Sequence, residues 1–282
     1  AVTTADKQIA LGSSTAQVKV SGTYTLPTAD GTANQVLTTD GSGAVTFATA
    51  GGGSPDLFAE NYNGTSTLPS ATGTNAFAIG AQSTSSAPNS IAIGTGAYVT
   101  HQGGVGLGYS PTVTANYGVA IGGNSVGAGA KVSGAGGVAL GGSNTQGSEA
   151  FSAVIDNTTT SYGASGANSI AMGSLAKATA TYNVAIGRDA LADGAANAVA
   201  IGRRADSGGA GSLALGIDSS AAGVNSVALS NSMASGSDSL AGAIGSASSS
   251  YGSQHTYSVA LGYRAVTTAD KQIALGSSTA QV

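Results

Sequence analysis

The sequence lacks cysteine and tryptophan and carries little charge. Without cysteine the chain can form neither disulfides nor thiolate metal sites. Only 8% of the residues are charged, and the net charge of −4 gives no basic surface of the kind that nucleic-acid binding requires. No apolar run approaches the roughly 18 residues of a membrane-spanning helix. We therefore expect no cofactor and no nucleic-acid partner, and a membrane could be reached only through segments outside this sequence.

What the chain has instead is glycine, which supplies 45 of the 282 residues, together with many small polar residues. Glycine and serine at this level are common in low-complexity or disordered chains. However, 41% of the residues are hydrophobic, which is enough material to bury. The arrangement of the hydrophobic residues therefore decides between disorder and a repetitive fold.

A four-residue tag recurs along the chain and has the form large–Ala–large–Gly. The glycines of four successive tags, Gly80, Gly94, Gly108 and Gly122, are 14 residues apart. Alternation of large and small residues is the period of a β-strand, and glycine after it permits a tight turn. A second, weaker strand follows each tag. The repeat therefore predicts an all-β, parallel β-solenoid, whose 14-residue coils each hold two short strands and stack about 4.8 Å apart.

The large tag residues are expected to form one continuous core inside this solenoid, while the tag alanines point outward. In this interpretation the exposed alanine faces of three chains pack about a common axis in a homotrimer. The residues assigned to the core are Ile79, Ile91, Ile93, Leu107, Val119, Ile121, Val138, Leu140, Ile170, Val184, Ile186, Val199, Ile201, Leu213, Leu215, Val227, Val259 and Leu261.

Asparagine stands two residues before the first large residue of several tags, at Asn75, Asn89, Asn168, Asn197 and Asn225. Asparagine tolerates left-handed backbone conformations and can bond its own backbone. We interpret this column as the corners of the coils rather than as a row of ligand-binding amides. Other coils place a tyrosine at the same position, namely Tyr117, Tyr182 and Tyr257.

The tags at 89–94 (Asn-Ser-Ile-Ala-Ile-Gly), 168–173 (Asn-Ser-Ile-Ala-Met-Gly) and 225–229 (Asn-Ser-Val-Ala-Leu) carry a family likeness. With their spacing they resemble the YadA-like head repeats of trimeric autotransporter adhesins. The resemblance implies a left-handed parallel β-roll, three chains associated side by side, and a head that binds host or matrix surfaces. It also implies an extracellular position at the cell surface, on a fibre anchored in the outer membrane.

The chain begins and ends on the same eighteen residues, AVTTADKQIALGSSTAQV, at 1–18 and 265–282. This identity predicts a tandem array with a period of 264 residues. In that array residues 1–18 end one roll, residues 19–72 form a connector, and residues 73–282 form the next head.

Within the connector, Val36–Thr39 and Ala44–Phe47 flank an Asp-Gly pair and predict a β-hairpin. The segment AGGGSP at 50–55 predicts a flexible joint. The connector is similar to segments of phage tail-fibre proteins, so the fibre could belong to a bacterial surface or to a virion.

No catalytic, cofactor-binding or metal site can be assigned. Neither His101 nor His255 has another ligand residue at a suitable spacing. Most carboxylates stand at expected turns, which turn chemistry explains better than an acid pair for glycan cleavage. The sequence is therefore interpreted as a structural extracellular fibre with an adhesin-like head, which mediates surface attachment or spacing through a surface protein or glycan of unknown identity. The alternative is a phage tail fibre or tailspike, with or without glycan hydrolase activity.

Two local features give further expectations. Asp189, Arg204 and Asp218 stand two residues past the closing glycine in successive coils, which predicts a charge ladder with Arg204 between two carboxylates. The tag spacing lengthens to 32 residues after Gly141 and again before Gly262, the latter gap holding a degraded coil around Ile244. The first gap is predicted to hold either a recognition loop or a degenerate coil around Phe151–Ile155.

Overall fold

The protein, described here from a computed structural model, divides into two compact units, Ala1–Ala59 and Glu60–Val282. The structure describes residues 19–20, 24–27, 29, 31–33, 35–49, 68–123, 129–153, 161–242 and 251–277. All regular secondary structure in these ranges is β-strand. The repeated segment at 1–18 and the joint expected at 50–55 lie outside the described residues.

The first unit holds two antiparallel pairs of strands. Strand β1 (Lys19–Val20) pairs with β2 (Tyr24–Thr25), and β3 (Gln35–Thr39) pairs with β4 (Val45–Thr49). The second pair is the predicted hairpin. The Asp40 carboxylate closes its turn, because Oδ1 accepts hydrogen bonds from the backbone N–H groups of Ser42 at 2.7 Å and Ala44 at 3.1 Å.

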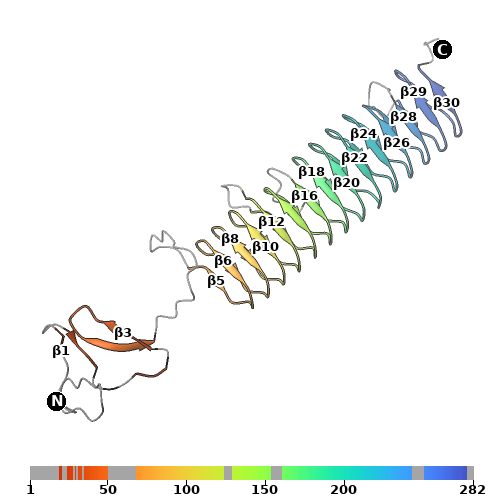
Figure 1. The fold of residues 1–282 in the computed structure, drawn as a ribbon. Coiled ribbons are helices and arrows are strands. Elements are labelled where there is room, and N and C mark those ends of the chain that lie inside the picture. The colour runs from red at the N-terminus through yellow and green to blue at the C-terminus, as the bar shows by residue number, and fades with distance from the viewer. Residues whose placement is uncertain are drawn as a thin grey trace, which may run out of the picture. The chain divides into compact units, whose positions relative to one another are not determined.

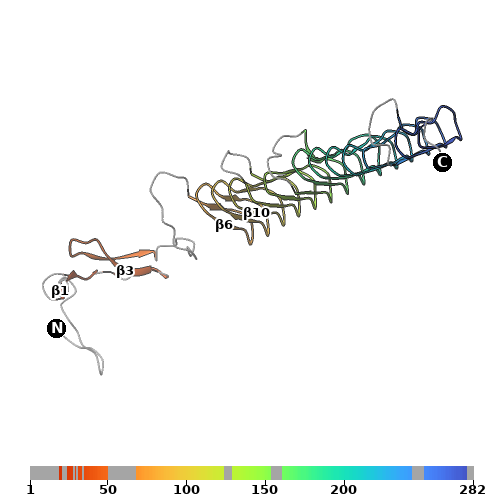
Figure 2. The same cartoon turned by 90° about the horizontal axis from the view of Figure 1, so that it is seen from above.

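The second unit is a parallel β-solenoid, as predicted, in which each coil adds one strand to each of two sheets (Figures 1 and 2). The strands of the larger sheet are the tags. They are β6 (Phe77–Ile79), β8 (Ile91–Ile93), β10 (Val105–Leu107), β12 (Val119–Ile121), β14 (Val138–Leu140), β16 (Phe151–Ala153), β18 (Ile170–Met172), β20 (Val184–Ile186), β22 (Val199–Ile201), β24 (Leu213–Leu215), β26 (Val227–Leu229), β28 (Leu240–Gly242), β29 (Val259–Leu261) and β30 (Ile273–Leu275).

The second sheet is formed by the two-residue strands between the tags. They are β5 (Ser70–Ala71), β7 (Thr84–Ser85), β9 (Tyr98–Val99), β11 (Thr112–Val113), β13 (Lys131–Val132), β15 (Asn144–Thr145), β17 (Gly163–Ala164), β19 (Lys177–Ala178), β21 (Leu191–Ala192), β23 (Asp206–Ser207), β25 (Ser220–Ala221) and β27 (Met233–Ala234). The described roll thus includes Ser70, slightly before the expected boundary at residue 73. The left hand of the coil stays a prediction.

Both long gaps in the tag spacing contain an additional coil. Phe151–Ala153 pairs in register with the tags on either side of it, so most of the gap after Gly141 is a degenerate coil. Residues 154–160, the rest of any recognition loop, lie outside the described residues. In the second gap the tag is Leu240–Gly242, not the expected segment around Ile244, which is also outside the described residues.

The two faces of the tag strands are reversed relative to the prediction. Ala92, Ala120, Ala185 and Ala200 are among the tag alanines with an exposed fraction of 0%, so alanine lines the interior. Because neighbouring residues of a strand point to opposite faces, the large residues point outward. None of the predicted core residues is buried in the single chain: Ile79, Ile91, Ile93, Leu107, Val119, Ile121, Val138, Leu140, Ile170, Val184, Ile186, Val199, Ile201, Leu213, Leu215, Val227, Val259 and Leu261.

The reason is the narrow interior of the roll. A Cβ atom added to Gly104 would lie only 2.8 Å from Cγ1 of Val99, so the space there does not admit even a methyl group. The interior of the next coil is filled in the same way, with valine against glycine: a Cβ atom on Gly118 would meet Cγ1 of Val132 at 2.8 Å. Alanine, serine and glycine therefore occupy most interior positions, and valine fits only where glycine faces it, whereas leucine or isoleucine would be too large. The expectation that alanine faces form the trimer contact is therefore wrong.

Serine hydroxyl groups extend the interior beside the alanines. Ser169, Ser212 and Ser226 each precede a tag, are almost fully buried, and donate to the carbonyl oxygen three residues earlier at 2.6–2.8 Å. Buried polar groups are tolerated when they are hydrogen-bonded in this way. The corner between the two strands of a coil is thus fixed by a side chain small enough to fit inside it.

The predicted corner column is confirmed by the backbone. Asn75, Asn89, Asn168, Asn197 and Asn225 all have positive φ angles, between 52° and 63°. The tyrosines of the same column share this conformation, at 58° for Tyr117, 62° for Tyr182 and 56° for Tyr257. Positive φ is uncommon for residues other than glycine and costs about 1–2 kcal/mol for a residue with a Cβ atom, less so for asparagine.

The narrow interior predicts that enlarging a tag alanine destabilises the roll. Ala200→Val should lower the free energy of unfolding by about 1–3 kcal/mol, because two added methyl groups overpack a fully buried position. Ala222→Val, at an exposed position of the same roll, is the matched control and should change stability little. Chemical denaturation measures both, and equal effects would contradict the narrow interior.

The corner conformation predicts a second effect on stability. Asn197 has a φ of 63°, which a β-branched residue adopts poorly, so Asn197→Val should cost about 1–2 kcal/mol. Asn197→Gly should be tolerated, since Gly103, Gly136 and Gly211 occupy this position in other coils with φ of 64–66°. Thermal unfolding of the two variants makes the comparison. A stable valine variant would show that the corner can change its backbone conformation.

Candidate functional site

The outward side chains of the tag strands form a continuous apolar strip, which we call the tag face. It runs along the fourteen tag strands of the described roll, in which aliphatic residues stack on aliphatic residues: Val199 pairs with Leu213, and Ile201 with Leu215. The exposed fraction reaches 39% at Ile121, 43% at Leu215 and 69% at Ile273. A monomeric soluble protein rarely leaves so long an apolar strip open to water.

The outward residues of the smaller sheet form the second-sheet face, which is more polar. A shallow groove of about 270 Å³ lies on it, lined by Thr112, Thr114, Lys131, Val132, Ser133, Asn144 and Gln146. Lys131 is exposed and makes no ion pair with a described residue, whereas Lys177 pairs with Asp193 at 3.2 Å on the same sheet. This face therefore offers hydroxyl, amide and charged groups to a ligand.

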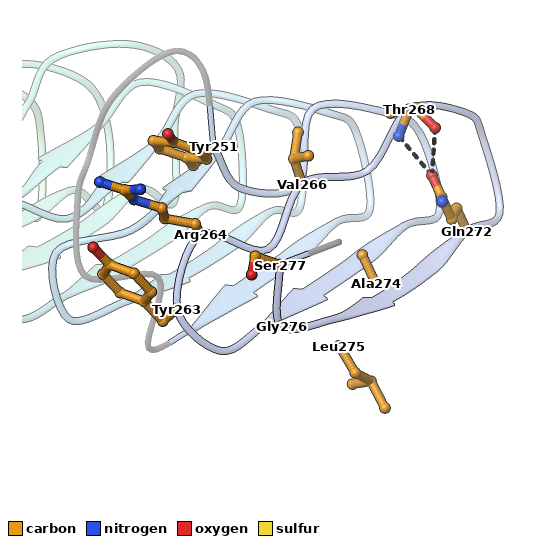
Figure 3. A pocket seen from close by; sticks show the side chains of 10 residues that line it. All are labelled: Tyr251, Tyr263, Arg264, Val266, Thr268, Gln272, Ala274, Leu275, Gly276 and Ser277. Carbon is orange, nitrogen blue, oxygen red and sulfur yellow. Dashed lines mark hydrogen bonds between the residues drawn. The ribbon is translucent and has the colours of Figure 1, made fainter. Parts of the chain in front are cut away.

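A larger pocket of about 610 Å³ lies at the last described coils (Figure 3). The guanidinium carbon of Arg264 is 5.0 Å from the ring centre of Tyr263 and 5.7 Å from that of Tyr251. Ala274 also lines the pocket and is half-buried, whereas the equivalent Ala260 is fully buried. The pocket is thus the open side of the last described coil. We did not predict it, because Tyr251 comes from the coil before that of Tyr263 and Arg264.

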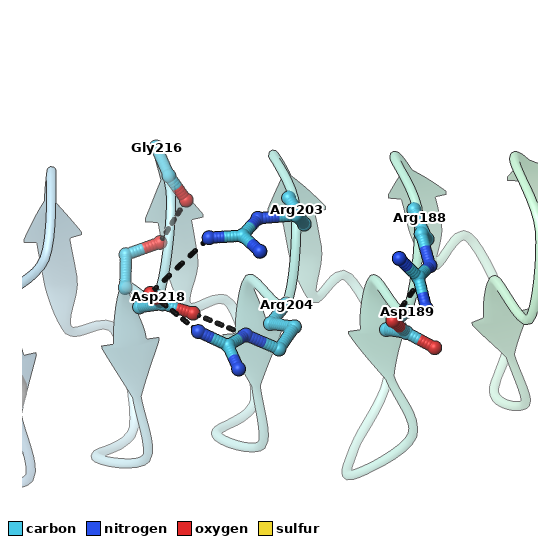
Figure 4. A network of polar contacts seen from close by, with 7 residues as sticks. Arg188, Asp189, Arg203, Arg204, Gly216 and Asp218 are labelled. Atoms are coloured by element: carbon cyan, nitrogen blue, oxygen red, sulfur yellow. Dashed lines mark hydrogen bonds and ion pairs between the residues drawn. The ribbon is translucent and has the colours of Figure 1, made fainter.

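The predicted charge ladder lies at the turns after β20, β22 and β24 (Figure 4). Arg204 donates to Asp218 through Nε at 2.6 Å and through a terminal guanidinium nitrogen at 2.8 Å. Asp189 pairs instead with Arg188 of its own coil at 3.3 Å, and Arg203 lies 3.9 Å from Asp218. The structure thus brings Arg204 and Asp218 together, but no ion pair between described residues joins Asp189 to Arg204.

The stacking that we expected does hold for the backbone. The N–H of Arg204 donates to the carbonyl of Arg188 at 2.9 Å, and the N–H of Asp218 donates to that of Arg203 at 3.0 Å. Asp189 pairs elsewhere because Arg188, one residue earlier, competes for its carboxylate. The hydrogen bond from Arg204 lowers the pKa of Asp218 below its usual range, and the charges of Arg204 and Arg203 act in the same direction.

Among the described residues no group of three or more His, Asp or Glu side chains could hold a metal ion, and no helix is long and apolar enough to cross a membrane. The carboxylate with a raised pKa is Asp206 on the second-sheet face. Burial is the main cause, and the nearby charge of Asp193 adds to it. This single partly buried acid does not make the opposed pair in a cleft that glycan cleavage requires.

The two perturbed carboxylates predict opposite effects of amidation. The pKa of Asp218 is lower in the folded chain than in the unfolded one, so its ionised form stabilises the fold, and this stabilisation is lost as the pH falls through the folded pKa. The pKa of Asp206 is raised on folding, so its ionisation destabilises the fold as the pH rises above the unfolded pKa.

At pH 7, Asp218→Asn should therefore lower the melting temperature and Asp206→Asn should raise it. Both differences from the parent chain should shrink as the carboxylates become protonated, below about pH 4. Melting curves across the acidic range test this. The same sign for both variants at pH 7 would show that one of the two environments is assigned incorrectly.

Comparison with known proteins identifies the repeat. The model of the YadA head domain repeat matches residues 71–97, 164–190, 184–205, 207–229 and 256–279. No curated protein matches the chain significantly. Among solved structures, the collagen-binding domain of the Yersinia adhesin YadA aligns with 22% identity over 76% of this chain and 72% of that chain, with a TM-score of 0.19.

The assignment rests on the repeats. The matched segments cover coils from both ends of the described roll, and each contains at least one tag with its corner. The tail-fibre alternative receives no support from these matches. The matched coils of this roll are therefore YadA-like head repeats, and the roll resembles the heads of trimeric autotransporter adhesins.

Proposed function

We propose that this chain is the adhesive head of an extracellular fibre, in which three copies associate through their tag faces. The observation that carries the proposal is the set of YadA head repeats along the roll. The head binds a protein or glycan on another surface, and the rigid stack of coils also spaces that contact away from the surface that carries it. The role is one of attachment and not of catalysis.

The apolar strip supports the trimer. Residues such as Ile186, Ile201 and Leu215 point out of the coil in register, so the strip is flat and repeats every coil. Three such strips facing a common axis bury one another without changing the coil. Burial of apolar surface then contributes about 25 cal/mol per Å² removed from water, which a single narrow roll cannot obtain from its alanine interior.

The same arrangement leaves the second-sheet face outside. Its polar groove around Lys131 and its exposed Tyr98 are then presented three times around the fibre. Repetition of one weak site raises the overall strength of attachment to a surface with many ligands. We further propose the tandem array, because residues 1–18 repeat a segment whose second copy contributes the tag strand β30.

The proposal predicts that a charge on the tag face separates the copies. Ile186→Lys should convert a trimer into monomers in analytical ultracentrifugation, because three lysines would meet near the axis without partners. Leu191→Lys, which adds the same charge to an aliphatic residue of the second-sheet face, should stay trimeric. A monomeric parent chain would contradict the trimer.

Attachment is tested with beads coated with the full chain, applied to surfaces that carry extracellular-matrix proteins, glycans or host cells. The parent and the Leu191→Lys chain should hold beads on at least one surface, and Ile186→Lys should hold far fewer because three-point attachment is lost. Trimeric chains that attach to none of these surfaces would show a spacer and not an adhesin.

A further inference from the structure

Exposed large side chains outside the tag face concentrate at the two edges of the roll. We define two edges by their positions in the coil. The leading edge consists of the residues that stand two and three positions before the first residue of each tag strand. The trailing edge consists of the residue that follows each closing glycine. The leading edge holds Tyr117, Tyr182, Val224 and Tyr257, with exposed fractions of 61%, 57%, 47% and 61%. The trailing edge holds Tyr109, Ile217 and Tyr263, with exposed fractions of 46%, 54% and 61%.

Arginine adds to the trailing edge. The side chain of Arg188 is 68% exposed and that of Arg203 is 50% exposed, although both lie near carboxylates. Elsewhere the two edges carry mostly small or polar residues, such as Asn, Gly, Ala, Ser and Thr. The large residues are therefore exceptions to the repeat, and neither the coil interior nor the tag face explains them.

These exceptions occur at the same height or at neighbouring heights on the two edges, and two of the pairs are one coil apart. Tyr109 follows β10, and Tyr117 precedes the next tag strand, β12. Ile217 follows β24, and Val224 precedes the next tag strand, β26.

The other two levels match within a single coil. Arg188 follows β20 and Tyr182 precedes it, while Tyr263 follows β29 and Tyr257 precedes it. Tyr117, Tyr182, Val224 and Tyr257 of the leading edge thus each have a large counterpart on the trailing edge no more than one coil away, which is about 4.8 Å along the stack. The chemical types also match: ring with ring, aliphatic with aliphatic, and cation with ring.

Within one chain the two members of each pair do not meet, because they lie at opposite ends of a tag strand. No ring contact between described residues joins them; the cation–π contacts of the described roll are those of Arg264. A threefold axis changes this. When three tag faces surround the axis, the leading edge of one copy lies beside the trailing edge of the next copy at the same height.

We propose that these four pairs form contacts between adjacent copies and limit how far the copies of the trimer can shift along the axis. The proposal rests on the trimer of the proposed function and adds the residues that align it. In it, Tyr117, Tyr182, Val224 and Tyr257 of one copy contact Tyr109, Arg188, Ile217 and Tyr263 of the next. The occupant of each edge is therefore a second copy of this chain.

The tag face alone defines the register poorly. It repeats every coil, so a copy displaced by one coil would again place Val, Ile or Leu against Val, Ile or Leu. The edge pairs do not repeat in this way. Along the sheet order, the trailing-edge members follow β10, β20, β24 and β29, which are five, two and three strands apart. A copy displaced by three or more coils in either direction would separate the members of all four pairs by more than one coil, and such a loss of contacts is the usual form of selection against a wrong alignment.

Cysteine cross-linking tests the pairing, since the chain has no cysteine of its own. Tyr257→Cys and Tyr263→Cys chains with different affinity tags are produced together and treated with a short thiol–thiol cross-linker. A covalent dimer that carries both tags is expected. Each variant alone should give no dimer, because a threefold axis keeps three copies of one edge position apart.

A double variant gives an independent measurement at another level. Ile217→Cys with Val224→Cys in one chain should yield covalent trimers on a denaturing gel. Tyr117→Cys with Tyr263→Cys, which pairs positions from distant levels, is the matched control and should yield none. All of these positions are exposed turns, and circular dichroism confirms that each variant folds.

The outcomes separate this proposal from the one on which it rests. Trimers in ultracentrifugation that cross-link at mismatched levels, through single variants, or not at all overturn the edge pairing and leave the trimer standing. Monomers in ultracentrifugation overturn both. Cross-linked trimers from the matched positions alone support both.

Discussion

The width of the coil interior determines the rest of this structure. Two strands of two or three residues, joined by tight corners, leave space for alanine or serine in most coils, and for valine where glycine faces it. At Gly104 even a methyl group would be too close to Val99. Alanine and serine therefore fill the roll, and the aliphatic residues of the same strands are left on its outside. A chain of this kind cannot bury its own large aliphatic residues. They can be buried only by association with another surface, so the fold itself creates the need for association.

The corners show what the repeat costs and how it is tolerated. Every described coil needs a left-handed residue before its tag strand, and glycine or asparagine supplies it in most coils. On the other side of the tag, Gly202 has a φ of 135°, and a Cβ atom there would lie 2.4 Å from the carbonyl oxygen of Gly216. Side chains are excluded there by the next coil itself, which explains the regular glycine of the tag. Tyr117, Tyr182 and Tyr257 are exceptions, because tyrosine adopts a positive φ angle less readily than glycine or asparagine.

Much of this fold could be predicted from the sequence, because the features concerned are local. The strand period, the corner column and the hairpin around Asp40 each follow from a few neighbouring residues. The inward face could not be obtained in this way. Alternation shows that Ala200 and Ile201 point in opposite directions, but only the distance between the sheets decides which one is inside. The usual assumption that larger apolar residues are buried fails in a roll too narrow to hold them.

The candidate site was predictable to a similar extent. Stacking along the roll placed Arg204 beside Asp218, because equivalent positions of adjacent coils must be neighbours. The pairing of Asp189 with Arg188 depends on the choice between two nearby partners, which the coil register does not determine. The pocket around Arg264 involves Tyr251 and Tyr263 from different turns, and their convergence depends on side-chain directions that the repeat does not specify.

The positions that repeat in every coil and the positions that vary between coils therefore lie in different parts of the roll. The interior can hold only small residues or valine, since at most tags alanine stacks on the alanine of the next coil and a larger residue would disturb both neighbours. The tag face inherits this uniformity, because it is the other side of the same strands. Large residues that differ from coil to coil can be placed only where a side chain has space and does not have to pack against the next coil. Such positions lie at the edges and on the second-sheet face. An uneven set of large residues at the edges is then a simple way for a periodic fibre to limit the possible alignments of its copies.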